Sequence, residues 1–229
     1  MSLTPEQILY EDNHLLIVNK PAGLLVQGDH TGDVPLVELG KAYIKEKYDK
    51  PGDVFLGVVH RLDRPVSGVV VLARTSKALA RMSALFQTRD VEKTYWALVG
   101  QAPPTDAETL THWLTKDPKK NKAKARAEAG ADRKRADLSY RLLLQSKDAF
   151  LLEVRPLTGR PHQIRVQLAA IGCPIRGDLK YGFAKPNPDA SISLHARTLS
   201  FIHPVKKTPL RLSAPLPDEA GWQAFSSLT

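Results

Sequence analysis

A short segment in the first third of the chain combines groups that could act as acid, base or nucleophile. Residues 60–68 read HRLDRPVSG, so a single carboxylate, that of Asp63, stands among one histidine and two arginines. Nearby positive charge favours the ionised carboxylate, which can then serve as a nucleophile or a base. The proline and glycine of this segment predict a tight loop. The alternative is a structural Asp63 that is held in surface salt bridges.

A second polar cluster lies about a hundred residues later. Residues 157–165 read LTGRPHQIR, in which Thr158 and Gly159 predict a turn before the start of a helix. Backbone N–H groups at a helix start attract anions, and Arg160 and Arg165 could bind a phosphate or a carboxylate through paired hydrogen bonds. The alternative is a capped helix with exposed arginines.

Other families of active site leave no signature in this chain. The sequence contains no GxxxxGK[ST] or GxGxxG loop, no GxSxG motif and no HExxH motif, and it has a single cysteine, Cys173. Nucleotide-dependent, serine-hydrolase and metal chemistry are therefore disfavoured. One cysteine and the lack of a long apolar run or a signal-like start indicate a cytoplasmic protein without a membrane segment. We expect a protein that works without a cofactor or a metal.

The charge of the chain points to a polyanionic partner. The formal net charge is +9, and residues 116–141 alone hold ten basic residues against four acidic ones. This stretch has almost no large apolar residue before Leu138, so it predicts a surface loop or hairpin, with a basic insert at about 116–137. Its lysines could contact an RNA backbone, although a solvated surface loop is the alternative. The candidate backbone contacts are Lys119, Lys120, Lys122 and Lys124.

The hydrophobic pattern predicts one α+β domain over residues 1–229. Val69 to Ala73 form a continuous apolar run, which predicts a strand that is buried on both faces. A helix should follow, capped by Thr75 or Ser76. The proline-rich tail from about 203 to 229 is expected to be extended. Further strands are predicted within 8–20, 94–99, 138–155 and 193–201, and further helices within 35–48 and 162–170.

Four sequence blocks occur in order: 10–24, HRLD with SG at 60–68, KTYWALV at 93–99, and TGRPHQIR at 158–165 with its continuation to LHA at 194–196. Together they give the chain a resemblance to the RluA-type family of RNA pseudouridine synthases. They cover residues from about 8 to 215. Many relatives carry an S4 RNA-binding domain ahead of the catalytic one, and here we expect the catalytic domain only. Val66 and Pro161 depart from the residues usual in the family.

The resemblance implies a fold and a set of site residues. The fold is a mixed, mostly antiparallel central sheet, flanked by helices and loops, with a central active-site cleft. Asp63 falls on the catalytic aspartate, Tyr95 on the active-site tyrosine that stacks on uracil, and Arg165 on the arginine that pairs with the aspartate. The family also suggests a monomer. The expected substrate-binding residues are His60, Arg61, Arg160, His162, Gln163 and Leu194.

The implied reaction is the isomerisation of uridine to pseudouridine in rRNA or tRNA. The target base must leave its stack to reach the carboxylate, and Arg61 could fill the vacated space or hold the flipped nucleotide. Whether Asp63 attacks the ribose or the base, or assists a proton transfer, is left open. Two alternatives are a non-catalytic RNA-binding or ribosome-assembly protein on the same fold, and a nuclease that uses Asp63 and His60 as base and acid.

Overall fold

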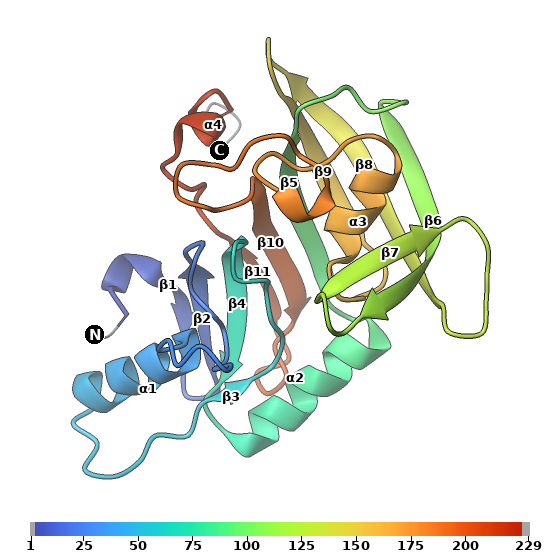
Figure 1. Cartoon of the computed structure of the whole chain (residues 1–229). Helices are drawn as coiled ribbons and strands as arrows, with labels where there is room; N and C mark the ends of the chain where they lie inside the picture. Colours follow the sequence, from blue (N-terminus) through green and yellow to red (C-terminus); the bar gives the residue numbers. More distant parts are fainter. Residues whose placement is uncertain (1–2, 226–229) are drawn as a thin grey trace. The chain divides into compact units, whose positions relative to one another are not determined.

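The computed structural model describes residues 3–225 (Figure 1). The chain divides into two compact units, and each consists of two separate segments. The first unit contains Met1–Glu92 and Ala196–Pro215, and the second contains Lys93–His195 and Leu216–Thr229. The structure does not determine how the two units are placed relative to each other. The single domain expected from the sequence therefore stays a prediction.

The first unit is built on a mixed, mostly antiparallel sheet. Its strands follow the order β1–β2–β4–β10, with β3 beside β4 and β11 beside β10. Strand β10 begins with the last two residues of the second unit and continues in the first. The strands are β1 (Ile8–Glu11), β2 (Leu15–Lys20), β3 (Gly57–Val58), β4 (Ser67–Ala73), β10 (Leu194–Ile202) and β11 (Pro209–Ser213), and a short 3-10 helix, η1 (Pro5–Gln7), precedes them.

Two helices cover opposite faces of this sheet. Leu15 and Ile17 of β2 share a core with Met82 of helix α2 (Ser76–Thr88). The next residue on the opposite face, Leu16, lies against Gly40 of helix α1 (Leu36–Lys47). Every residue of β4 is buried, because this strand is enclosed on both sides. The run of apolar residues in the sequence therefore predicted its environment correctly, and the Thr75 hydroxyl caps α2 as expected.

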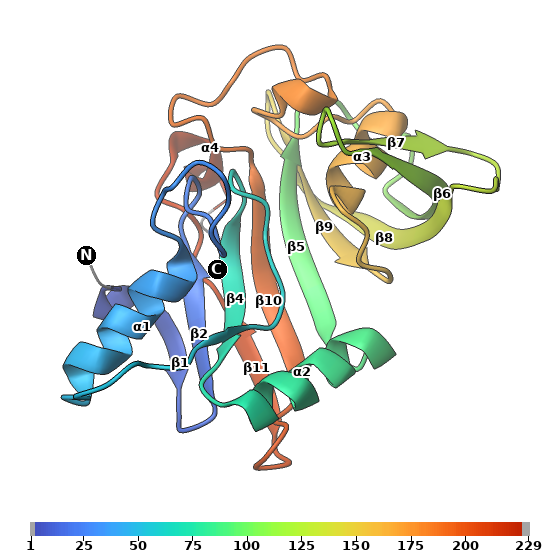
Figure 2. The ribbon, with the colours of Figure 1, turned by 60° about the horizontal axis from the view of Figure 1, so that its bottom comes forward.

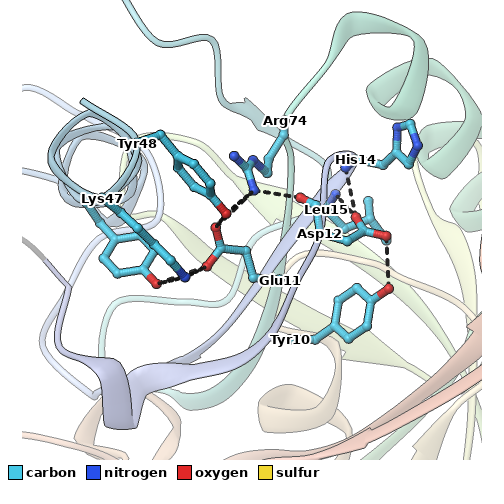
Figure 3. A network of polar contacts seen from close by, with 9 residues as sticks. Tyr10, Glu11, Asp12, His14, Leu15, Lys47, Tyr48 and Arg74 are labelled. Carbon is cyan, nitrogen blue, oxygen red and sulfur yellow. Dashed lines mark hydrogen bonds and ion pairs between the residues drawn. The ribbon is translucent and has the colours of Figure 1, made fainter. Parts of the chain in front are cut away.

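A buried carboxylate ties α1 to the sheet (Figure 3). Glu11 accepts hydrogen bonds from Tyr43 at 2.9 Å and Tyr48 at 2.7 Å, and ion pairs from Lys47 at 2.7 Å and Arg74 at 2.9 Å. Burial of Glu11 opposes its ionisation, but the hydrogen bonds from Lys47 and the two tyrosines prevail and lower its pKa. The network fixes the end of α1 beside the β1–β2 turn.

The second unit holds the remaining sheet and two small hydrophobic cores. Its strands follow the order β5–β9–β8–β6–β7, and each neighbouring pair is antiparallel. Trp96 and Trp222 belong to one core, and Val166 and Tyr181 to the other. The elements are β5 (Glu92–Val99), β6 (Ala107–Asp117), β7 (Lys122–Arg126), β8 (Lys134–Gln145), β9 (Phe150–Pro156), α3 (Gln163–Ala170), η2 (Leu179–Tyr181) and α4 (Ala220–Gln223).

The α+β class and most predicted elements are confirmed. The basic stretch is a hairpin, β6–β7, followed by the start of β8 (Figure 2). Strand β6 was not predicted. The tail expected to be extended contains β11 and the short helix α4, so that prediction is right only in part, and its last residues, 226–229, lie outside the described residues. Within residues 3–225, no helix is long and apolar enough to cross a membrane.

Candidate active site

The Asp63 loop connects β3 to β4 in the first unit. Leu62 is buried and anchors the loop, whereas Asp63 beside it is half-buried. The N–H of Val66 donates to the Asp63 carbonyl at 3.0 Å and closes the turn that the sequence predicted. At the start of β4, Gly68 has a φ of 113°, and a Cβ there would collide with the backbone of Ala196. Only glycine suits this conformation and this close approach.

A lysine that the sequence did not single out lies behind this loop. Lys20 ends β2, pairs with Gly68 in the sheet and is fully buried. Its Nζ donates to the carbonyls of Pro21 at 2.9 Å, Leu24 at 2.8 Å and Arg64 at 3.2 Å, which match the three N–H bonds of an ammonium group. Burial lowers the pKa of Lys20 to about 7, although the negative charge of Asp63 raises it. Lys20 thus supports the loop and places a titrating charge near Asp63.

The Lys20 site makes a testable contribution to stability. The unfolded chain keeps this proton up to a pKa of 10.5, whereas the folded chain releases it near 7, so the free energy of unfolding should rise with pH between these values. We expect about 2 kcal/mol of this rise between pH 7 and pH 9. Denaturant titrations at both pH values should show the rise in the parent protein and its loss in Lys20→Met.

An exposed lysine of the same unit provides the control. Lys41 pairs with Glu38 on the surface of α1, so Lys41→Met should keep the rise. Equal pH dependence in the parent protein and in Lys20→Met would contradict this assignment.

The other predicted residues of this loop differ in their surroundings. His60 is half-buried, stacks on Phe86 with ring centroids 4.7 Å apart, and accepts a hydrogen bond at Nε2 from the N–H of Val71 at 3.1 Å. This geometry makes His60 a support of the loop. Arg61 is exposed, and its contact with the substrate stays a prediction. Arg64, its neighbour in the loop, donates to the Gly23 carbonyl and pairs with Asp33 at 2.7 Å.

In the second unit, Arg165 forms a buried ion pair that the sequence did not predict. Its Nε and Nη2 donate to the two carboxylate oxygens of Asp178 at 2.7 and 2.8 Å. Both side chains are buried, and this paired geometry is the strong form of the interaction. The Tyr181 ring lies 5.1 Å from the Arg165 guanidinium. The guanidinium is therefore held in one orientation by a carboxylate and an aromatic face.

Tyr181 connects this pair to its surroundings. Its hydroxyl accepts a hydrogen bond from the N–H of Ala123 at 2.8 Å and lies 2.8 Å from Nδ1 of His162. His162 stands at the start of α3 with a φ of 54°, in the left-handed region that is uncommon for residues other than glycine. Such strain persists only where the surroundings impose it, and it is frequent at functional sites.

The rest of the TGRPHQ segment is organised by one buried amide. Gln163 accepts hydrogen bonds from the Thr158 hydroxyl at 2.8 Å and from the N–H of Arg160 at 2.9 Å, and donates to the Asp137 carbonyl at 2.9 Å. Arg160 is half-buried and donates to the Arg135 carbonyl at 3.1 Å. These bonds fix the loop that leads into α3, so Gln163 serves the site by shaping it.

The predicted residues fall in both units. Asp63, His60 and Arg61 belong to the first, whereas Tyr95 and Arg165 belong to the second, as do the remaining candidates. Tyr95 is half-buried on β5, opposite Val154. The pairing of Asp63 with Arg165 stays a prediction. The remaining candidates in the second unit are the buried Leu194 on β10 and four exposed lysines, Lys119, Lys120, Lys122 and Lys124.

Comparison with known proteins decides the family. Residues 14–170 match the family described as RNA pseudouridylate synthase. The chain belongs to this family. The matched segment contains Asp63, Tyr95 and Arg165 in the order that the sequence resemblance used, so the resemblance is confirmed at the level of the family.

Individual relatives of this pseudouridylate synthase chain agree. It is 37% identical to the ribosomal large subunit pseudouridine synthase D of Xanthomonas campestris, with 94% of the chain and 67% of the relative covered. It is 33% identical to synthase C of Vibrio cholerae, with 91% and 65% covered. The chain thus spans about two thirds of the length of these relatives.

The fold is shared as well. The human RNA pseudouridylate synthase domain containing 4 superimposes with a TM-score of 0.77 at 27% identity, and the alignment covers 92% of this chain and 88% of that one. Among residues 3–225, no group of three His, Cys, Asp or Glu side chains lies close enough to hold a metal ion.

Proposed function

We propose that this chain isomerises uridine to pseudouridine within structured RNA. The observation that carries the proposal is the family match over residues 14–170, which includes the whole Asp63 loop and the start of α3. The reaction breaks the bond between the ribose and N1 of uracil and joins the ribose to C5 of the same base. C5 loses a proton and N1 gains one, so the RNA keeps its length and mass. The names of the relatives, both ribosomal large subunit synthases, favour large-subunit rRNA over tRNA as the substrate.

Each candidate residue has a separate role in the proposed reaction. Asp63 acts on the flipped nucleoside as nucleophile or base. Tyr95 stacks on the uracil, and Arg165 orients the Asp63 carboxylate. Arg61, which is exposed in the same loop, holds the flipped nucleotide or fills its place in the stack. The basic segment 116–137 contributes contacts to the RNA backbone. The proposal includes a monomeric protein that works in the cytoplasm.

A tritium-release assay tests the proposal. The protein is incubated with large-subunit rRNA and, separately, with bulk tRNA, each carrying tritium at C5 of uridine. Isomerisation replaces the C5 hydrogen by the bond to ribose, so tritium should appear in solvent while the RNA keeps its length on a denaturing gel. Shortened RNA would instead support a nuclease, and binding without release would support a non-catalytic RNA-binding protein. The family match does not favour either of these alternatives.

A further inference from the structure

The second unit contains a basic groove at the edge of its sheet. The groove has a volume of about 540 Å³ and lies between β7, α3 and η2. Strand β7 ends the strand order, so its outer edge has no neighbouring strand within the described residues. Small side chains, Ala123, Ala125 and Ala169, line the groove and leave the space open. This volume falls within the range of sites that hold a small ligand or a ligand fragment.

Four cations line the groove, and none of its lining residues is acidic. Lys122, Lys124 and Arg126 alternate along β7 and are exposed, while the alanines between them turn towards the core beside Tyr181. Side chains two residues apart on a strand repeat about every 7 Å, so the cations form a regular row. Lys180 adds a fourth charge from η2. A regular row of cations suits a chain of phosphates better than a single small anion.

The groove also offers apolar surface. Leu179 is 54% exposed at its rim, and Lys122 lies 5.5 Å from the Tyr181 ring. Exposed apolar surface beside a basic row can contact the bases of a single-stranded nucleic acid while the cations contact its phosphates. The charge and the surface therefore favour RNA over a peptide that adds a strand to the β7 edge.

We propose that this groove binds a segment of the substrate RNA outside the target nucleotide, through the row of cations on β7. The proposal rests on the proposed function for the identity of the RNA. The proposal gives the lysines of the basic hairpin two different roles. Lys122 and Lys124 in the groove bind RNA directly, whereas Lys119 and Lys120 in the β6–β7 turn contribute only to the positive electrostatic potential of the surface. Tyr181, which lines the groove and faces Arg165, joins this RNA site to Arg165.

Two variants with equal loss of charge test the proposal. Binding of a large-subunit rRNA transcript is measured across a salt series for Lys122→Gln/Lys124→Gln and, as the control, for Lys119→Gln/Lys120→Gln. The groove pair should weaken binding several-fold and lower the slope of log affinity against log salt by about 1.4–1.8, the value for two lost phosphate contacts. The control pair should change the slope by less than half as much. All four lysines are exposed, so folding should be unaffected in both variants.

A third variant tests the groove without removing a cation. Ala170, exposed at the end of α3, also lines the groove, and Ala170→Glu should weaken RNA binding by introducing a negative charge. Equal effects of the two lysine pairs, or unchanged RNA binding in the groove pair, would overturn the proposal. The latter result would leave the β7 edge to a protein partner. Tritium release by the parent protein is scored separately, so failure of the groove and failure of the synthase activity can be distinguished.

Discussion

Replacement of Asp63 by Asn should abolish pseudouridine formation and leave the protein folded. The side chain keeps its size and only the charge is lost, and the loop is held by other groups, among them the N–H of Val66 that donates to the Asp63 carbonyl and the three hydrogen bonds of Lys20. A positioned acid or base contributes about 10²–10⁴-fold to a rate, so tritium release should fall by at least this factor. RNA affinity should remain close to that of the parent protein.

A neighbouring carboxylate provides a matched control. Asp33 pairs with Arg64 of the same loop, but both side chains are about half exposed, at 52% and 45%. Exposed pairs contribute little, so Asp33→Asn should keep turnover within a few-fold of the parent protein.

A second readout does not depend on activity. Because the charge of Asp63 raises the pKa of Lys20, Asp63→Asn should lower that pKa below 7, and the rise of stability with pH should begin at a lower pH. Turnover retained in Asp63→Asn would remove this residue from the catalytic role.

Strong local patterns made parts of the fold predictable. The apolar run at 69–73 specifies a doubly covered strand because both faces must be buried, and Thr75 before a helical pattern specifies a cap. Strand β7 was harder to predict because its inward-facing residues are alanines, the buried Ala123 and the half-buried Ala125, whose contribution to a hydrophobic alternation is weak. In β6 the buried residues are Leu110 and Leu114, four positions apart, a spacing that fits a helix as well as a strand.

The candidate site was predictable only where one segment carries the chemistry. Asp63 stands out because it is surrounded by cations in the sequence. The role of Asp178 depends on a fold that brings it to Arg165, 13 residues away and beyond the end of α3. Burial of Lys20 likewise depends on the return of the chain at Arg64, 44 residues later, whose carbonyl accepts a hydrogen bond from Lys20. Short-range patterns contain neither contact, so sequence reasoning named Asp63 and Arg165 as candidates and missed Lys20 and Asp178, which lie beside them in the structure.

Replacement of Asp178 by Asn should both destabilise the protein and impair catalysis. The carboxylate makes two hydrogen bonds of 2.7 and 2.8 Å to Arg165, and the two side chains are only 1% and 7% exposed. Asp178→Asn removes the negative charge from this buried ion pair, and breaking a buried pair costs about 3–5 kcal/mol. Glu38→Gln, which breaks the exposed pair with Lys41, is the control and should cost less than about 1 kcal/mol. Chemical denaturation measures the loss of stability in both variants. Equal losses would show that the Arg165–Asp178 pair contributes no more than an exposed pair.

A double variant separates the catalytic part of Arg165 from its structural part. Replacement of a buried ion pair by apolar residues of similar size is often neutral or stabilising, so Arg165→Met/Asp178→Leu should recover most of the stability lost in Asp178→Asn. If the Arg165 guanidinium orients the Asp63 carboxylate, tritium release by the fully folded double variant should stay at least about 10²-fold below that of the parent protein. If turnover recovers together with stability in the double variant, the Arg165–Asp178 pair only connects α3 to the loop before η2. Stability without turnover is the outcome that assigns Arg165 to the reaction.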